Sequence, residues 1–326
     1  MATAPHSSSE ATTRRVESAS FIDAATLMRI KNLQLRAKSV VEGFYNGLHR
    51  SPFHGFSAEF SQYREYSQGD DPRYLDWRLF ARSDRYYIKQ FEDETNRRCY
   101  LVVDQSQSMG YQSLEYSKAD YARTLAATFA YYLTLQRDSV GLMTFDQRVR
   151  EFHPARHRPG HMQRMMVTLE QSVQGTGTDL HAPLEQLAGL VRKRGLIVVI
   201  SDLLASLDSL RKNLSYLRTR GHEVLLLRVL DPAEVDFPFD QAAMFRDPET
   251  GRNLFIDPSV ARDEYHRRFQ EHDGEIRDTC AHLGIDYSHL QTDQPLELAL
   301  FDLLSAQVRR GRLTHRGGPQ RQGGPS

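Results

Sequence analysis

The run of residues 100–110 constrains the fold of this chain more than any other stretch. Residues 100–103 are aromatic or aliphatic with no polar face, as expected of a strand covered on both sides in a parallel sheet. The strand ends on Asp104, and the hydroxyls of Ser106 and Ser108 follow at alternate positions. Parallel sheets bind ligands beyond the carboxyl ends of their strands, and side chains alternate along an extended backbone. The sequence therefore predicts that three oxygens face one point at the end of this strand.

Two later segments can supply further ligand oxygens at the end of this strand. Residues 175–179 form a glycine-rich loop that carries Thr178 ahead of a helical pattern, and residues 196–200 form a second apolar strand that is followed by Asp202. Taken alone, an Asp-x-Ser-x-Ser pattern is more typical of a strand-ending turn with hydroxyl caps. The added threonine and aspartate, in this order and context, favour a cation site.

The site resembles the metal-ion-dependent adhesion site of von Willebrand factor A domains. Its members in this chain are Asp104, Ser106, Ser108, Thr178 and Asp202. Thr178 matches better than Thr176, because Leu184, six residues on, falls where that family has an apolar helix residue. The resemblance implies an α/β fold with a doubly wound, mostly parallel sheet.

The same resemblance implies one bound Mg²⁺ or Mn²⁺ ion. Ser106, Ser108 and Thr178 would bind it with neutral hydroxyls, while Asp104 and Asp202 would act largely through waters and hydrogen bonds. Mg²⁺ takes six oxygens in octahedral geometry at about 2.1 Å. An ion with mostly neutral ligands keeps positive charge and an open position, which a carboxylate from a partner protein would fill.

Composition excludes several classes of protein. The 326 residues contain 42 lysines and arginines against 42 aspartates and glutamates, so charge gives no reason to expect a nucleic-acid partner. The only cysteines are Cys99 and Cys280, which are far apart and suit a reducing compartment. No apolar run approaches the roughly 20 residues that span a bilayer, and the start lacks the apolar core of a secretory signal. We expect a cytoplasmic protein without a transmembrane segment.

Residues 51–98 alternate charged and aromatic side chains at high density. The pattern favours partly buried, mutually paired charges around a turn, although arginine and tryptophan also anchor interfaces. A catalytic role for the acids is weaker, because nothing places a substrate there. The residues that define this charged block are Asp70, Asp71, Arg73, Asp76, Trp77 and Arg82.

The charged block narrows the resemblance. Its run over residues 69–77, followed by Ala81 and Arg82 and then by the metal motif, resembles the bacterial family catalogued as domain of unknown function fifty-eight. The resemblance covers roughly residues 27–308. It implies a von Willebrand A-like domain with an added amino-terminal block, and a partner of the MoxR-type AAA+ ATPase class, whose genes commonly neighbour this family. Many members carry amino-terminal membrane helices, which this sequence lacks, so membrane anchoring is not carried over.

The remaining pattern predicts four segments. Residues 1–20 are expected to be disordered, and residues 21–96 to hold an amphipathic helix over 27–44 and the charged block. Residues 97–308 are expected to form the von Willebrand A-like domain, with a hairpin inserted near 243–256 and a helix over 258–283. Residues 309–326 form a basic, glycine-rich tail that we expect to be disordered. The amphipathic helix is expected to dock on its own domain, with a membrane surface as the alternative.

Two smaller features need an interpretation. Residues 231–239 contain two prolines after a strand, which predicts irregular backbone near the rim of the metal site. His153, His157 and His161 are spaced as in some zinc sites, but the prolines and glycine between them favour an exposed loop.

Enzyme motifs are largely absent from the sequence. It has no nucleotide-binding glycine loop, no nucleophile elbow and no zinc-protease helix. The nearest alternative resembles a phosphatase of the haloacid dehalogenase type that would use Asp104, but the general acid of that family would stand where this chain has Ser106. A second alternative is a structural protein with a vestigial metal site. The sequence therefore favours a metal-dependent protein-binding adaptor.

Overall fold

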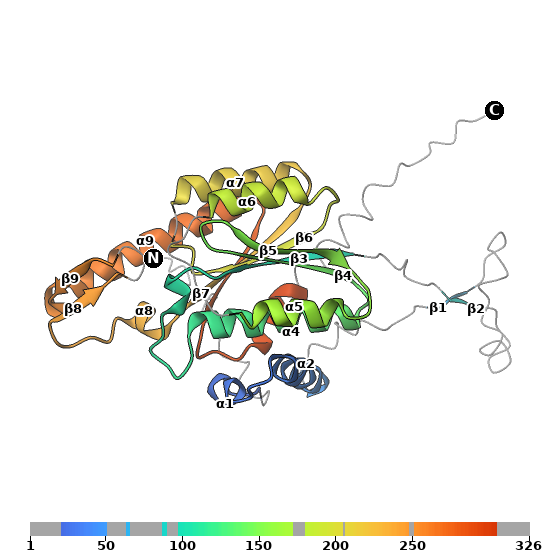
Figure 1. Ribbon diagram of the computed structural model, residues 1–326, viewed down its shortest axis with the longest axis horizontal. Coiled ribbons are helices and arrows are strands. Elements are labelled where there is room, and N and C mark those ends of the chain that lie inside the picture. Colours follow the sequence, from blue (N-terminus) through green and yellow to red (C-terminus); the bar gives the residue numbers. More distant parts are fainter. Residues whose placement is uncertain are drawn as a thin grey trace, which may run out of the picture.

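The structure is a computed structural model that describes residues 21–50, 63–65, 87–89, 97–171, 180–204, 206–247 and 251–304 (Figure 1). The segments for which we predict disorder, residues 1–20 and 309–326, lie outside the described residues, and so do the six residues that define the charged block.

A six-stranded sheet forms the centre of the molecule, with the order β10-β7-β6-β3-β4-β5. All neighbours run parallel except β5, which is antiparallel to β4. Counted along the chain within this sheet, the order is 6-5-4-1-2-3, so the winding reverses between β3 and β6. This confirms the predicted doubly wound, mostly parallel α/β class. The strands are β3 (Arg98–Asp104), β4 (Ser139–Phe145), β5 (Val149–Arg156), β6 (Leu196–Ser201), β7 (Glu223–Leu230) and β10 (Asp286–Gln291).

Helices cover both faces of the sheet, which is why its central strands β3, β4 and β6 read as largely apolar runs (Figure 1). Leu101 and Val103 of β3 point into a core shared with α2, α4 and α5, whereas Tyr100 and Val102 point into a core shared with α6, α7 and α9. A last helix over residues 297–304 joins the first core. The helices are α2 (Leu33–Arg50), α4 (Lys118–Leu135), α5 (His161–Leu169), α6 (His181–Leu190), α7 (Leu207–Thr219) and α9 (Pro258–Leu283).

The amino-terminal helix packs on the sheet domain, as predicted, but it is broken in two. Helix α1 (Ala24–Met28) and α2 are separated by a short break in which the guanidinium of Arg36 donates to the carbonyls of Met28 and Ile30 at 3.3 and 2.8 Å. Phe44 and other apolar residues of α2 are buried in the core that contains α4. A separate antiparallel pair, β1 (Tyr63–Glu65) and β2 (Tyr87–Lys89), flanks the charged block.

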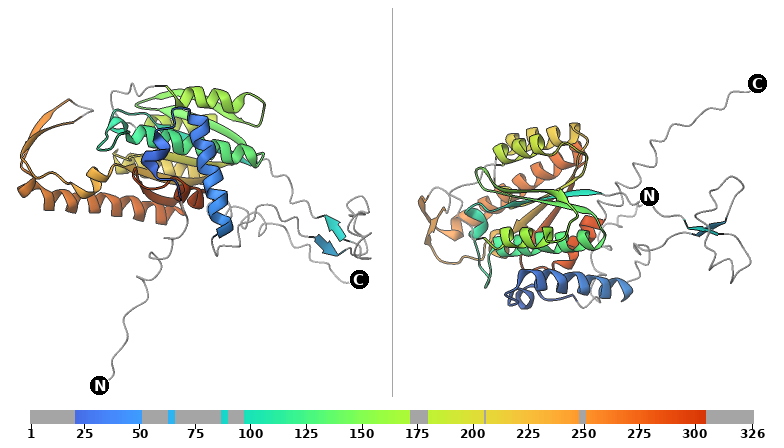
Figure 2. Two further views of the ribbon diagram at one scale, coloured as in Figure 1. Left: turned by 90° about the horizontal axis from the view of Figure 1, so that it is seen from below. Right: turned by 45° about the vertical axis from the view of Figure 1, so that its right-hand side comes forward.

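The predicted hairpin insertion is present as an arm that projects from the body (Figure 2). It consists of β8 (Ala243–Arg246), β9 (Asn253–Ile256) and the amino-terminal part of α9. Asp257 caps α9 by accepting from the N–H of Ser259 at 3.0 Å, and Pro258 takes the first helical position, where no N–H is needed. These local signals explain why the start of α9 could be read from the sequence.

Two predictions about local structure were wrong. Residues 231–239 are not irregular throughout, because Asp231 caps a short helix, α8 (Pro232–Asp236). The histidines do not share an exposed loop. His153 lies in β5, since an edge strand tolerates the adjacent Pro154, and buried His161 opens α5, with Nε2 2.8 Å from the carbonyl of Val140.

Candidate metal centre

The candidate centre lies where β3 and β6 end side by side. Val103 pairs with Ile200 in the parallel register, so Asp104 comes beside Ser201 and Asp202. Doubly wound sheets bind ligands at this point, where the winding reverses and neighbouring loops diverge. The side chains of Asp104 and Asp202 are 1% and 0% exposed. The structure therefore brings together two buried acids that are far apart in the sequence.

Both carboxylate oxygens of Asp104 accept hydrogen bonds. The N–H of Ser106 donates to Oδ1 at 2.8 Å, and the hydroxyl of Ser201 donates to Oδ2 at 2.6 Å. Burial, together with the negative charge of Asp202, raises the pKa of Asp104 to about 7. Sequence analysis missed Ser201, although it directly follows the apolar run of β6.

The hydroxyls of Ser106 and Ser108 point at each other across 3.0 Å. We expected the chain to stay extended beyond β3, so that alternate side chains would face one side. Instead, Ser108 begins a short 3-10 turn, η2 (Ser108–Gly110). The hydroxyls still converge. Two neighbouring ligands of an octahedral ion at about 2.1 Å are about 3.0 Å apart, which is also an ordinary hydrogen-bond length. The pair can hold a small divalent ion with little movement.

A buried lysine stands beside Asp202. Lys118 Nζ lies 2.9 Å from Asp202 Oδ2 and 2.6 Å from Glu234 Oε1, and its side chain is 0% exposed. Burial lowers the pKa of Lys118, but the charges of Asp202 and Glu234 outweigh that effect and raise it above its ordinary value. Lys118 is therefore an ammonium ion. Sequence analysis missed it, because its only local signal is its position just after Ser117, the cap of α4.

Hydrogen bonds to Asp231 and Glu234 hold the rim of the centre. Asp231 accepts from the N–H of Ser113 at 2.8 Å and from the N–H of Ala233 at 2.9 Å, and its own N–H donates to Glu234 at 2.9 Å. The hydroxyl of Tyr265 on α9 donates to the carbonyl of Glu234 at 2.6 Å. Helix α8 is thereby fixed between the loop before α4 and the arm.

A buried arginine supports the Asp202 backbone from the other side. Arg228 on β7 donates to the carbonyl of Asp202 at 3.1 Å and to Asp273 on α9 at 3.0 Å, and its side chain is 1% exposed. Its guanidinium also lies over the ring of Phe269 at 5.1 Å. Arg228 therefore links α9, through an ion pair, to the residue that follows β6, through a hydrogen bond.

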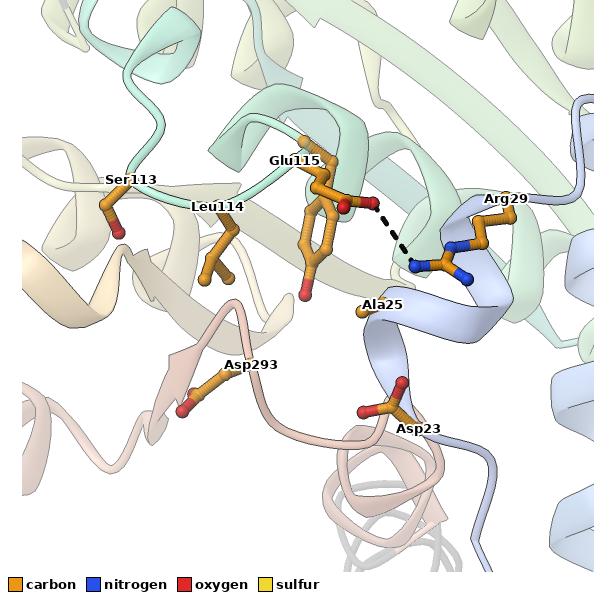
Figure 3. A pocket seen from close by; sticks show the side chains of 8 residues that line it. Asp23, Ala25, Arg29, Ser113, Leu114, Glu115 and Asp293 are labelled. Atoms are coloured by element: carbon orange, nitrogen blue, oxygen red, sulfur yellow. Dashed lines mark ion pairs between the residues drawn. The ribbon is translucent and has the colours of Figure 1, made fainter.

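A pocket of about 510 Å³ lies beside the same rim (Figure 3). Ser113 lines it together with Asp23, Glu115 and Asp293, and Arg29 reaches Glu115 at 3.6 Å. Arg29 and Glu115 are largely exposed, so this ion pair is weak. None of the predicted metal ligands lines this pocket, so it is separate from the centre at Asp104.

Several predicted site residues fall outside the described part of the chain. They are Thr178, Asp70, Asp71, Arg73, Asp76, Trp77 and Arg82. Among the residues that are described, no three histidine, cysteine, aspartate or glutamate side chains are grouped to hold a metal ion. The donor set at Asp104 is instead hydroxyls and carboxylates, which suits Mg²⁺ or Mn²⁺ better than zinc. No helix within the described residues is long and apolar enough to cross a membrane.

Comparison with known proteins places the chain in a family. Uncharacterized protein Rv1480 of Mycobacterium tuberculosis is 30% identical over 289 residues, which cover 87% of this chain and 90% of that protein. BatB from Bacteroides thetaiotaomicron is similar in structure, with a TM-score of 0.47 and 16% identity over 65% of this chain and 99% of that one. The SpRpn10 VWA domain has a TM-score of 0.39 and 12% identity over 62% and 92%. These two likenesses are too distant to carry an argument, so the fold class rests on the strand order. The family model described as "Protein of unknown function DUF58" matches residues 62–275, and the chain belongs to that family, as the sequence resemblance predicted.

Proposed function

We propose that this protein is a metal-dependent protein-binding module. One Mg²⁺ or Mn²⁺ ion would be held by the hydroxyls of Ser106 and Ser108 and by Thr178, with Asp104 and Asp202 in support. The observation that carries the proposal is the hydroxyl pair, 3.0 Å apart, beside two buried carboxylates at the reversal point of the sheet. The bound ion would supply an electrophilic position for a carboxylate of the partner.

The hydrogen bonds of the two acids support this division of labour. Asp104 is held through both oxygens by Ser106 and Ser201, and Asp202 is held by Lys118 and, at 3.3 Å, by the N–H of Leu204. Acids that are already bonded in this way are suited to orient groups around an ion. The neutral hydroxyls of the two serines are then its direct ligands, and they leave its charge for the partner.

The partner that we propose is a MoxR-type AAA+ ATPase, for which this protein would act as a cytoplasmic adaptor that recruits substrates. The support is the family resemblance alone. The charged block lies within the matched residues 62–275, and its arginines and acids are either a structural clasp or part of the partner surface.

Binding is favoured over catalysis. A phosphohydrolase would need Asp104 as a nucleophile, but this side chain is 1% exposed and both of its oxygens accept hydrogen bonds. Ser106, two positions on, has a hydroxyl that cannot replace a carboxylic acid as proton donor.

A metal titration tests the first part of the proposal. Mn²⁺ at about 100 times its dissociation constant should stabilise the wild type by roughly 2.7 kcal/mol, measured by chemical denaturation, if it binds only the folded state. Asp104→Ala and Ser106→Ala should lose this gain. Ser39→Ala, in helix α2 and far from the centre, is the matched serine control and should keep it. No stabilisation of the wild type at high Mn²⁺ or Mg²⁺ would instead favour a structural protein with a vestigial site.

A binding assay tests the second part. Pull-down of a MoxR-type ATPase should require Mg²⁺ and fail with Ser106→Ala. Acidic residues of the ATPase are then replaced one at a time, and a double-mutant cycle is run for the best candidate. Once the metal is absent, replacing the acidic residue of the partner should no longer weaken binding. If the losses of binding free energy from the two single changes simply add in the double variant, the metal does not bridge the two proteins.

A further inference from the structure

Lys118 is the most unusual group near the candidate centre. Its ammonium is completely buried and contacts two carboxylates, Asp202 at 2.9 Å and Glu234 at 2.6 Å. Burying an ammonium ion costs several kcal/mol unless well-placed partners offset the lost solvation. Replacing a buried ion pair by apolar residues of similar volume often leaves the protein equally stable or more stable. A charged cluster at this position therefore calls for a reason besides stability.

Hydrogen bonds to its side chain and to its backbone hold Glu234 in place beside Lys118. Its Oε2 accepts from the N–H of Asp231 and its backbone carbonyl accepts from Tyr265, so the residue is fixed at both ends. Lys118 itself lies on the first turn of α4, directly after the Ser117 cap. Both anchors are rigid, and the ammonium is held between them next to Asp202.

We propose that Lys118 keeps Asp202 from binding the metal ion directly and thereby makes the centre selective for a carboxylate ligand. The inference rests on the proposed function and specifies the chemistry of that site. Asp202 Oδ2 is committed to the ammonium, and Oδ1 accepts from the N–H of Leu204. An ion held by the hydroxyls of Ser106 and Ser108 would therefore receive little negative charge from Asp202.

Charge explains the consequence. The affinity of a hard ion rises with the number of charged ligands, and its remaining attraction for a further anion falls by the same logic. If Lys118 were absent, Asp202 would be free to approach the ion and neutralise it. Lys118 thus lowers the affinity for the metal alone and raises the affinity of the loaded centre for a carboxylate.

The test needs variants that remain folded. Lys118→Met alone leaves two buried carboxylates unpaired and destabilises the protein, so the main variant is the charge-matched pair Lys118→Met with Glu234→Gln. Glu234→Gln alone is the control, because it retains the contact between Lys118 and Asp202. Folding of each variant is checked by circular dichroism and thermal melting without metal.

The first measurement is the Mn²⁺ dissociation constant of each folded variant by calorimetry. Changes to groups that orient ligands alter metal affinity by roughly 10- to 100-fold, so the double variant should bind Mn²⁺ at least about tenfold more tightly than the wild type. Glu234→Gln should stay close to the wild type. The second measurement repeats the titration in saturating acetate, which should tighten Mn²⁺ binding in the wild type and have a smaller effect in the double variant.

The outcomes separate this inference from the proposed function. If the wild type binds Mn²⁺ and the folded double variant binds it equally or more weakly, Lys118 does not restrain Asp202 and the inference is overturned. An equal effect of acetate in both proteins also overturns it. If the wild type binds no Mn²⁺ while the double variant does, the proposed function fails for the wild-type protein, whereas the restraint of Lys118 on Asp202 is upheld.

Discussion

The buried carboxyl of Asp104 should make the metal-free protein less stable as the pH rises, and Asp104→Asn should remove that dependence. The folded protein holds this proton more tightly than the unfolded chain, because burial and the charge of Asp202 raise the pKa of Asp104 from 3.8 to about 7. The stability that the protonated Asp104 contributes is therefore fully present below about pH 4 and is lost as the pH rises through 7. Asparagine cannot ionise, and its amide can still accept from the N–H of Ser106 and donate to Ser201.

The magnitude follows from the same values. One pKa unit corresponds to about 1.36 kcal/mol, so a carboxyl moved from 3.8 to about 7 costs the wild type on the order of 4 kcal/mol at pH 8. Most of it, about 3 kcal/mol, is lost between pH 5 and pH 8. Because other groups also titrate, the informative quantity is the difference between the two proteins, which should grow with pH in favour of Asp104→Asn.

The assay is urea denaturation in EDTA at several pH values from 5 to 8, followed by the same series with saturating Mn²⁺. In EDTA the asparagine variant should be the more stable protein at pH 8. With Mn²⁺ the difference in stability between the two proteins should narrow or change sign, since only the wild type has the charged carboxylate that supports the ion. Parallel stability curves for the two proteins in EDTA would refute the reasoning, because they would show that Asp104 ionises freely in the folded protein.

Three further predictions concern other parts of the molecule. Asp273→Ala should cost about 3 to 5 kcal/mol in denaturation experiments, because it leaves the buried guanidinium of Arg228 without its carboxylate; a cost below about 1 kcal/mol would contradict a tight coupling of α9 to the centre. Glu297→Gln should stabilise the protein at pH 8 and lose this advantage in acid below pH 4.5, because burial raises the pKa of Glu297 and the uncharged form is the one that the fold favours; a constant difference across pH would rule this out. Phe255→Ser on the arm should change the free energy of unfolding by about 0.5 kcal/mol or less, since this side chain is 70% exposed; a large loss would show that the arm is packed in solution.

The sequence was sufficient to predict the class of the fold and the edge of the sheet where Asp104 and Asp202 meet. Unbroken apolar runs that end on acids identify strands buried on both faces, and such strands are parallel, so their carboxyl ends meet at one edge. Local signals were also sufficient for the start of α9, because the Asp257 cap and Pro258 fix where this helix begins. Patterns failed where tertiary contacts overrode them, as in the strand β5, which continues through Pro154 because it lies at the edge of the sheet.

The tertiary structure alone decided which groups surround the acids. Ser201 reaches Asp104 across 97 positions of sequence, and Lys118 reaches Asp202 across 84 and Glu234 across 116. No period or motif encodes such pairs, because they depend on how the sheet winds and on where α4 and α8 begin. A single buried lysine in a helix looks like any surface lysine until its partners are in place. The sequence thus predicts which acids end the strands, and the packing of α4 and α8 against them places Lys118 between Asp202 and Glu234.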